Sequence, residues 1–209
     1  MMSELTFYTN PQSRGRIARW MLEEAGADYE TVGLDYAAGM KGDDYRAINP
    51  MGKVPAIVHR GRTVTECAAI CAYLADAFPE AGLAPTADER ADYYRWMFFA
   101  AGPLEAAATE RARGIVVTPE QSRMVGYGSF DTVVDTLEQA VAAHDYIAGD
   151  RFTAADVYVG SHILWGSQFG WLPKRDAFDA YMARLADRPA YVRGGEKDDA
   201  LMAEMQANG

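Results

Sequence analysis

Polar side chains gather near the start of the sequence, in the segment YTNPQSRGR at residues 8–16. This segment offers a phenol (Tyr8), a hydroxyl (Ser13) and two guanidinium groups (Arg14 and Arg16). A phenol or hydroxyl can donate a hydrogen bond to an anion, and a guanidinium group can attract one. The segment is therefore a candidate site for binding or activating an anionic group.

A second candidate is Lys53-Val54-Pro55, within NPMGKVPAIV at residues 49–58. A residue before proline is pushed to extended geometry, so we expect Val54 to present its N–H and carbonyl like the edge of a sheet. A peptide-like ligand could dock there through two main-chain hydrogen bonds. An X-Pro bond has only a weak trans preference, so Pro55 is either cis or an ordinary trans proline that opens a strand.

A third candidate is Glu66-Cys67, immediately before an alanine-rich helical pattern. Free N–H groups and the dipole at a helix N-terminus favour an anion and lower the pKa of a thiol. Cys67 is thus either reactive or a packing residue of the size of serine. Cys67 and Cys71 form neither a CxxC pair nor a metal cluster, and the histidines are far apart, so we expect no metal site.

The first third of the chain must position these candidates, and its pattern mixes strands and helices. ELTFYT (4–9) predicts a strand, RIARWMLEEAGA (16–27) a helix that Gly26 ends, and YETVGLDY (29–36) a second strand. A polar loop follows, then a hairpin of PAIVH and TVTE around an RGR turn, and a helix over CAAICAYLADAFP (67–79). This order predicts an α+β sandwich rather than a regular βαβ array.

The remainder of the chain has helical periodicity. Residues 80–88 (EAGLAPTAD) concentrate glycine, proline and small polar residues, which suits a linker. Four helical patterns follow, the first interrupted near Gly102-Pro103 and the last reading DAFDAYMARLADRPAYVRG. We therefore divide the chain into a domain at 1–82, a linker at 83–90 and an all-helical domain at 91–209.

Thr153 and Asp156 have the spacing of a capping box, in which an N-cap threonine is answered by an acid three residues later. We expect this pair to serve folding rather than chemistry. Replacing Asp156 with alanine should cost on the order of 1 kcal/mol or more.

Composition narrows the possible partners. The 209 residues are 49% hydrophobic and carry a formal net charge of −10, which argues against nucleic acid or an anionic membrane surface as partner. The N-terminus lacks the basic and apolar regions of a signal peptide, and no segment approaches 18 uninterrupted apolar residues. We expect a cytoplasmic protein.

Four segments resemble the cytosolic glutathione S-transferase family, in its bacterial-type, serine-type form: YTNPQSRGRIARWMLEEAG, NPMGKVPAIV, TECAAICAYLAD and GDRFTAADVYVG. The resemblance covers almost the whole chain. It implies an α+β thioredoxin-like N-terminal domain followed by an all-α helical-bundle C-terminal domain. It also implies an enzyme that conjugates the thiolate of glutathione, its co-substrate, to hydrophobic electrophiles, with no other cofactor.

Two further functions fit the same scaffold. One is a glutathione-dependent thiol-disulfide reductase or peroxidase, which would differ only in the electrophile. The other is a catalytically weak binding protein. A homodimer is implied by the resemblance alone.

The resemblance also implies roles for the second and third candidates. Pro55 should be cis, and Val54 should hold the cysteinyl backbone of glutathione. Glu66 should take the ammonium of the γ-glutamyl end. Cys67 stands where the family carries a serine for the γ-glutamyl carboxylate, and because a thiol is a weaker donor than a hydroxyl, glutathione affinity should be lowered.

Lys41 and Lys53 flank the loop that leads to Val54. Each is a candidate to bind the glycyl carboxylate of glutathione. Each could equally be a solvated surface lysine.

In this family a tyrosine, serine or cysteine donates a hydrogen bond to the glutathione sulfur. Counting back from RGR leads to Asn10 rather than Tyr8, whereas counting back from the end of the first helix places Ser13 where serine-type relatives carry their hydroxyl. We predict Ser13 as the catalytic residue, with Tyr8, Asn10 or a main-chain N–H near Arg14 or Gly15 as alternatives. Ser13 could also simply cap the first helix.

The run YYRWMFFAAG at residues 93–102 is too apolar all round for a helix with one wet face. We expect most of it in the core or a dimer contact. One side should line the site for the hydrophobic substrate, and spacing points to Arg95, Phe98, Pro103 and, later in the chain, Trp165.

Overall fold

The computed structural model describes residues 3–36 and 39–207. The chain forms two compact units, which are treated separately below. One comprises the chain up to Ala84 together with the chain from Asp187 onward, and the other comprises Pro85–Ala186.

The first unit is built on a mixed four-stranded sheet of strand order β2-β1-β3-β4. β1 pairs in parallel with β2, whereas the β1–β3 and β3–β4 pairs are antiparallel. The strands are β1 (Leu5–Thr9), β2 (Glu30–Gly33), β3 (Ala56–His59) and β4 (Arg62–Val64). The two predicted strands and the predicted hairpin are confirmed.

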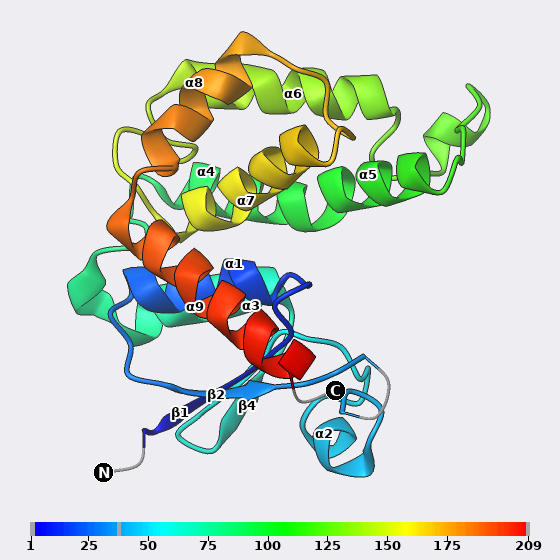
Figure 1. Ribbon diagram of the computed structural model, residues 1–209. Helices are drawn as coiled ribbons and strands as arrows, with labels where there is room; N and C mark the ends of the chain where they lie inside the picture. Colours follow the sequence, from blue (N-terminus) through cyan, green and yellow to red (C-terminus); the bar gives the residue numbers. More distant parts are fainter. Residues whose placement is uncertain (1–2, 37–38, 208–209) are drawn as a thin grey trace. The chain divides into compact units, whose positions relative to one another are not determined.

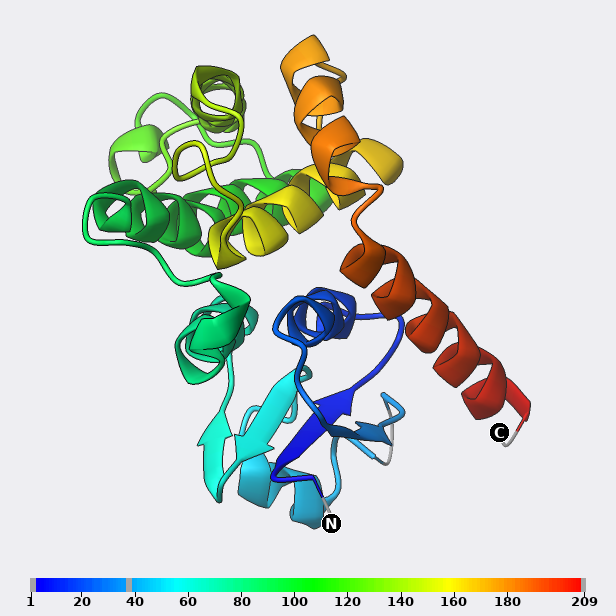
Figure 2. The ribbon, with the colours of Figure 1, turned by 90° about the vertical axis from the view of Figure 1, so that its left-hand side faces the viewer.

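Helices cover both faces of this sheet (Figures 1 and 2). α1 (Gly15–Glu24) and α3 (Cys67–Ala77) pack against each other on one face, and α2 (Asp43–Ile48) lies on the other. This is the thioredoxin-like arrangement that the resemblance implies. The N-terminal ends of α1 and α3 belong to the predicted site segments.

β1 and α1 follow from their patterns of burial. In β1, Leu5 and Phe7 are buried while Thr6 and Tyr8 are only partly so, because successive side chains of a strand point to opposite faces. α1 buries Ile17, Met21 and their neighbours, and Gly26, in the left-handed region, follows its end as predicted.

α2 was not predicted, because the stretch between the second strand and residue 49 was interpreted as a polar loop; residues 37 and 38 of this stretch lie outside the described residues. The helix has only six residues, begins with Asp43 and Asp44, and buries a single side chain, Tyr45. Acids in the first turn suit the helix dipole. A helix this short, with one buried residue, leaves no periodic signal in the sequence.

The last predicted helical pattern is in fact two helices, α8 (Asp176–Leu185) and α9 (Pro189–Ala207). Proline begins α9, and a residue before proline disfavours helical geometry, which explains the break. α9 packs along α1 (Figure 2). The compact units therefore differ from the expected division at 91–209, because α9 belongs with the sheet.

The second unit is entirely helical over its described residues. α4 continues through a π-helical turn (Ala100–Leu104) into α5, and Pro103 lies inside this turn, where an interruption was expected. The helices are α4 (Arg90–Phe99), α5 (Glu105–Ala112), α6 (Phe130–Ala143), α7 (Ala154–Gln168) and α8. Short 3-10 turns lie at Pro79–Ala81, in the first unit, and at Gln121–Arg123.

The capping box at the start of α7 is present. The buried Asp156 carboxylate accepts hydrogen bonds from the N–H and hydroxyl of Thr153, at 2.8 and 3.1 Å. It also accepts from the Ile147 N–H at 2.8 Å and the Tyr181 hydroxyl at 2.7 Å. Asp156 thus joins the loop before α7 to α8, which supports a folding role.

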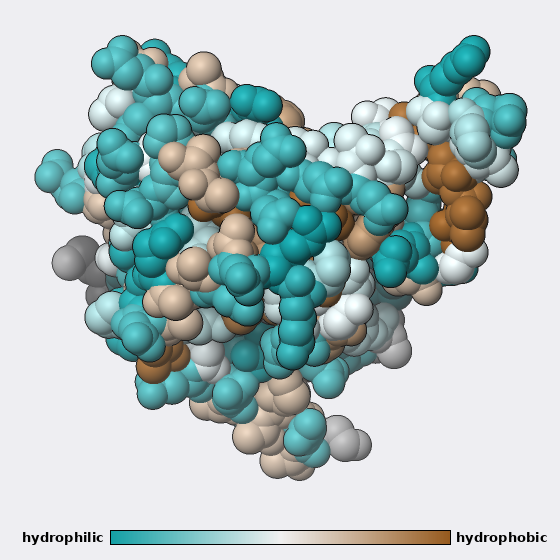
Figure 3. All heavy atoms as spheres, turned by 90° about the horizontal axis from the view of Figure 1, so that it is seen from above, coloured by the Kyte–Doolittle hydropathy of each residue, from teal (hydrophilic) through white to brown (hydrophobic). Residues whose placement is uncertain are grey.

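The segment between α5 and α6 exposes apolar side chains on the surface of the second unit. On the face shown in Figure 3, hydrophilic side chains predominate, and hydrophobic ones gather at the right-hand edge, where the segment between α5 and α6 lies. In that segment Ile115, Val116 and Met124 are exposed. Among the described residues, none of the helices has the length and hydrophobicity needed to cross a bilayer.

Candidate functional site

The loop at residues 10–14 joins β1 to α1 and is held by its own polar groups. The amide of Asn10 donates to the Leu34 carbonyl at 2.8 Å and accepts from the Gln12 N–H at 2.9 Å. The Tyr36 hydroxyl donates to the Gln12 carbonyl at 2.8 Å. Asn10, which is buried, therefore uses its side chain to shape the loop.

Ser13 lies at the mouth of α1 and is partly exposed. Its hydroxyl donates to the Asn10 carbonyl at 2.7 Å and accepts from the Gly15 N–H at 2.9 Å. Arg14 rather than Ser13 is the N-cap residue of α1, so the expectation that Ser13 caps this helix is wrong, and the second bond only gives the Gly15 N–H a partner. The same bond withdraws electron density from Oγ, which makes the hydroxyl a better donor to an anion.

Gly15 permits the close approach between β1 and α1. A Cβ added at Gly15 would lie 2.0 Å from Thr9 Oγ1, 3.1 Å from Ser13 Oγ and 3.2 Å from the Asn10 carbonyl oxygen. No side chain fits there without moving the Thr9 side chain or the loop. Glycine at this position is thus a requirement of the site's backbone.

Tyr8 has a different environment from Ser13. It packs on a cluster of Met40, Tyr45 and Ala56, and its ring centroid lies 5.5 Å from that of Tyr45. Val54 packs on the same cluster. Tyr8 therefore supports the loop that carries Val54.

The Val54–Pro55 peptide bond is cis, as the resemblance implies. The preceding carbonyl, that of Lys53, accepts from the Tyr45 hydroxyl at 2.6 Å and from the Asn49 amide at 2.7 Å. Burial raises the pKa of Tyr45 to about 12, which keeps this hydroxyl protonated as a donor. Among the described residues, the N–H and carbonyl of Val54 have no main-chain partner.

The two lysines differ in their surroundings. Lys41 Nζ donates to the Gly52 carbonyl at 2.7 Å, and Gly52 has a positive φ of 56° with the Met40 carbonyl too close for any Cβ. The Lys53 side chain is exposed. Lys41 thus stabilises the turn at Gly52 through its hydrogen bond, whereas the ammonium group of Lys53 is exposed and available to a ligand.

Cys67 is the first residue of α3, and Glu66 before it has a positive φ of 64° with an exposed side chain. The buried Cys67 thiol donates to the Arg14 carbonyl at 3.6 Å, which brings the start of α3 beside the loop of Ser13. A hydrogen bond with Cys67, together with burial, raises the pKa of the Cys71 thiol. Cys71 is buried on α3 and serves as a packing residue.

The candidates for the hydrophobic-substrate site all lie in the second unit. Phe98 is 70% exposed on α4, and Arg95 stacks over the Trp96 ring at 4.4 Å. Pro103 lies in the π-helical turn and Trp165 on α7, both partly exposed. α4 and α7 are in contact, so these residues belong to neighbouring helices of one bundle.

Sequence comparisons give the family. A family model described as "Glutathione S-transferase, N-terminal domain" matches residues 3–76. Glutathione S-transferase GstA of Escherichia coli O157:H7 is 32% identical over 189 residues, which cover 88% of this chain and 90% of that protein. This chain belongs to the glutathione S-transferase family. Its activity is that of a glutathione transferase.

Solved structures of glutathione S-transferases share the fold over nearly their whole length. A theta-class enzyme from Xanthomonas axonopodis pv. citri with glutathione bound is 29% identical, with a TM-score of 0.72 over 92% of this chain and 97% of that one. A sphingomonad glutathione S-transferase complexed with glutathione is 28% identical, with a TM-score of 0.76 over 93% and 98% of the two chains.

Several residues of the glutathione S-transferase site were not found from the sequence. Tyr36, Tyr45 and Asn49 fix the two loops through hydrogen bonds to main-chain carbonyls. Arg16 was named as a guanidinium group that could attract an anion, and in the structure it pairs with the Asp199 carboxylate and donates to the Pro11 carbonyl. The signal for Asn49 was available, because asparagine before proline favours a turn.

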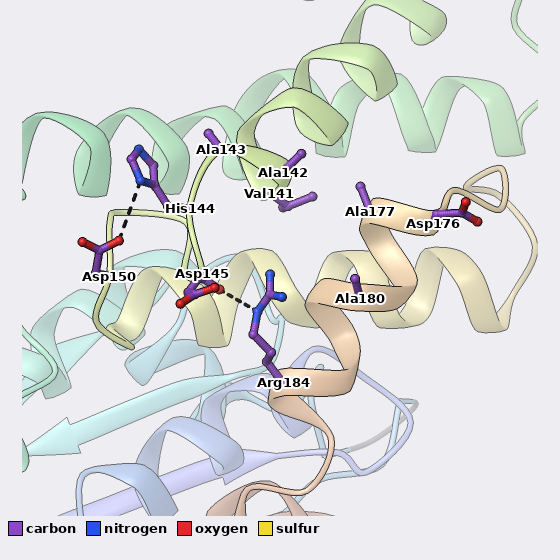
Figure 4. Close-up of a pocket in the computed structure, with 10 residues that line it drawn as sticks. All are labelled: Val141, Ala142, Ala143, His144, Asp145, Asp150, Asp176, Ala177, Ala180 and Arg184. Carbon is purple, nitrogen blue, oxygen red and sulfur yellow. Dashed lines mark hydrogen bonds and ion pairs between the residues drawn. The ribbon is translucent and has the colours of Figure 1, made fainter.

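One hollow of about 570 Å³ lies in the helical unit, away from every predicted residue (Figure 4). It is lined by the end of α6, the loop that follows it and α8, and two pairs of its polar groups interact with each other. The Arg184 Nε donates to the Asp145 carbonyl at 2.8 Å, and His144 Nδ1 lies 3.8 Å from Asp150. Among the described residues, no cluster of potential ligands is suited to hold a metal ion.

Proposed function

We propose that this glutathione transferase conjugates the glutathione thiolate to hydrophobic electrophiles, with the Ser13 hydroxyl activating the thiol. The observation that carries the proposal is the Gly15 N–H at 2.9 Å from Ser13 Oγ, at the mouth of α1. A free cysteine thiol has a pKa of about 8.5, and only its thiolate is a good nucleophile. A hydroxyl aimed at the sulfur stabilises the thiolate and lowers this pKa.

The hydroxyl must change partners to do this. It now donates to the Asn10 carbonyl at 2.7 Å. A rotation about the Cα–Cβ bond would redirect the proton to a sulfur at the open side of the loop, while the Gly15 N–H holds a lone pair of the oxygen. The thiol proton leaves to solvent, the thiolate forms the bond to the electrophilic carbon, and the leaving group departs with the displaced electron pair.

The alternatives to Ser13 fit this role less well. Asn10 uses both ends of its amide inside the protein, and Tyr8 packs on Tyr45. The Ser13 hydroxyl, in contrast, lies directly at the start of α1, beside the Gly15 N–H. We therefore retain Ser13 as the activating residue, and with it membership of the serine-type branch.

Glutathione as co-substrate would be held by two loops of the first unit. The N–H and carbonyl of Val54, which have no main-chain partner among the residues that the structure describes, suit the cysteinyl backbone. Lys53, with Lys41 as the second cation, would hold the glycyl carboxylate.

The γ-glutamyl end would lie at the start of α3. Glu66 would take its ammonium, and the α3 N–H groups its carboxylate. Because the Cys67 thiol is turned to the Arg14 carbonyl, we expect the main chain rather than this thiol to bind that carboxylate. Glutathione affinity should accordingly be modest.

We further propose that Arg95, Phe98, Pro103 and Trp165 line the site for the hydrophobic substrate, that the protein is a homodimer, and that it acts in the cytoplasm. The exposed Phe98 ring supports the first point. Truncating Phe98 to alanine should raise KM for an aryl electrophile without changing KM for glutathione. Sedimentation at micromolar concentration tests the dimer.

The test of the function combines binding and turnover. Titration calorimetry with glutathione should give heat of binding at millimolar concentration, and turnover should be seen with an aryl chloride. Ser13→Ala should bind glutathione normally and lose about tenfold or more in turnover, the value of one hydrogen bond to an anion. Normal turnover in Ser13→Ala, or turnover with a mixed disulfide alone, would overturn the proposal.

A further inference from the structure

Arg16, the last residue of YTNPQSRGR, holds the loop of Ser13 from outside. Its Nε donates to the Pro11 carbonyl at 2.6 Å, and the same guanidinium group donates through Nη2 to Asp199 Oδ1 of α9 at 2.6 Å. A guanidinium group is rigid and planar. When one of its N–H groups is bound to a carboxylate, the directions of its other N–H groups are therefore fixed as well. Asp199 thus determines how Arg16 meets the loop.

The neighbouring residue of α9 fixes where Asp199 lies. Asp198 is buried and pairs with the buried Arg19 of α1 at 2.8 Å, with side chains 1% and 3% exposed. Arg19 Nε makes this bond, while Nη1 of the same guanidinium group donates to the Thr31 hydroxyl at 3.1 Å. The register of α9 on α1 is therefore fixed by a buried pair, one residue from Asp199.

We propose that Asp199 and Arg16 are positioning residues for the Ser13 hydroxyl, with α9 orienting the loop through the Pro11 carbonyl. The proposal rests on the proposed role of Ser13. Pro11 lies two residues before Ser13, and the Asn10 carbonyl that receives the Ser13 proton belongs to the peptide bond that Pro11 completes. A shift of the Pro11 carbonyl would therefore also move the Asn10 carbonyl. That carbonyl is the acceptor that the Ser13 hydroxyl must release before it can donate to the sulfur.

The pair is partly exposed, with side chains 30% exposed for Arg16 and 71% for Asp199. Removing the carboxylate should therefore leave the fold intact, because exposed ion pairs contribute little to stability. The loss of Asp199 should instead lower the fraction of bound glutathione that is present as thiolate. We expect Asp199→Asn to lose about two- to fivefold in kcat/KM below the apparent thiol pKa.

The experiment compares pH profiles of kcat/KM in the full-length enzyme. In Asp199→Asn the apparent pKa should move upward while the plateau at high pH stays unchanged, because there the thiol ionises without help. Asp199→Glu, which keeps the carboxylate, should restore most of the shift. A purely structural role would lower the plateau as well.

Two matched controls separate positioning from general loss of charge. Lys197→Met removes another contact between α9 and α1, the bond of Lys197 Nζ to Glu23 at 2.5 Å. Glu4→Gln removes an exposed pair of the same unit, with Arg60 at 2.8 Å. Both should keep the profile of the native enzyme.

The outcomes distinguish this inference from the proposed function. An unshifted profile in Asp199→Asn, together with a shifted one in Ser13→Ala, would refute the positioning role and leave Ser13 standing. An equal shift in Lys197→Met would also refute it, since α9 packing alone would then be responsible. No shift in Ser13→Ala would overturn both.

Discussion

Gly15→Ala is the sharpest test of how the loop of Ser13 is built. The new Cβ would lie 2.0 Å from Thr9 Oγ1, against an optimum of about 3.5 Å for two heavy atoms. The overlap of about 1.5 Å is too large for small adjustments, because the Asn10 carbonyl and Ser13 Oγ already stand at 3.2 and 3.1 Å. Either the Thr9 side chain or the loop must move.

The expected cost follows from two opposing effects. Overpacking a tight site costs up to about 3 kcal/mol. Glycine to alanine in a helix gains up to about 1 kcal/mol in propensity. Gly15→Ala should therefore lower the free energy of unfolding by about 2 kcal/mol. Turnover should fall as well, because the new Cβ also crowds Ser13 Oγ, the proposed donor to the thiolate.

Urea denaturation measures the change, with Gly195→Ala as the matched control. Gly195 lies in α9, and an added Cβ there meets nothing within 4 Å, so this variant should be more stable by about 0.5–1 kcal/mol. Thr9→Ala removes the obstructing oxygen, which within the described residues has no hydrogen-bond partner. The double variant Thr9→Ala/Gly15→Ala should recover about 1 kcal/mol or more. A Gly15→Ala protein as stable as the native one would refute the packing argument.

Three further perturbations test other parts of the structure. Asp156→Ala leaves several buried donors unpaired and should cost about 3 kcal/mol in urea denaturation, well above the expectation for a cap alone; a loss near 1 kcal/mol would contradict the network. Asp198→Ala leaves the Arg19 charge buried and should cost about 3–5 kcal/mol, whereas Asp198→Leu with Arg19→Met should be near neutral, and equal losses in both would argue against a desolvated pair. A hydrogen bond from Arg151 lowers the pKa of Glu89, so this pair stabilises the fold above the unfolded pKa and is lost as pH falls through the folded one. Glu89→Gln should accordingly flatten the acid limb of a stability–pH curve, and an unchanged limb would exclude this pair as its cause.

The sequence predicts the elements whose signals are local. The alternation in β1 and the hairpin around RGR need only neighbouring residues, as does the capping box at Thr153. The cis bond at Pro55 came from the family resemblance rather than from the residues, since the chemistry of an X-Pro bond leaves both isomers open. α2 could not be predicted from the sequence, because one buried tyrosine in a helix of six residues gives no periodic pattern.

The rest depends on contacts between distant residues. Arg16 pairs with Asp199 across 183 positions, and no local rule chooses that acid over Glu23 or Glu24. Glu23 pairs instead with Arg193 and Lys197, and Glu24 pairs with Arg188. The packing of α9 on α1 rests on such choices, which is why composition and periodicity alone assigned α9 to the helical domain.

The central claim is that Ser13 activates the thiol of bound glutathione. The ultraviolet absorbance of the thiolate, followed against pH in the native enzyme saturated with glutathione, gives the thiol pKa directly. We predict a pKa below that of free glutathione, and a rise of about 1–2 units in Ser13→Ala, the equivalent of one hydrogen bond to a charged group. The same thiol pKa in both proteins would contradict the claim.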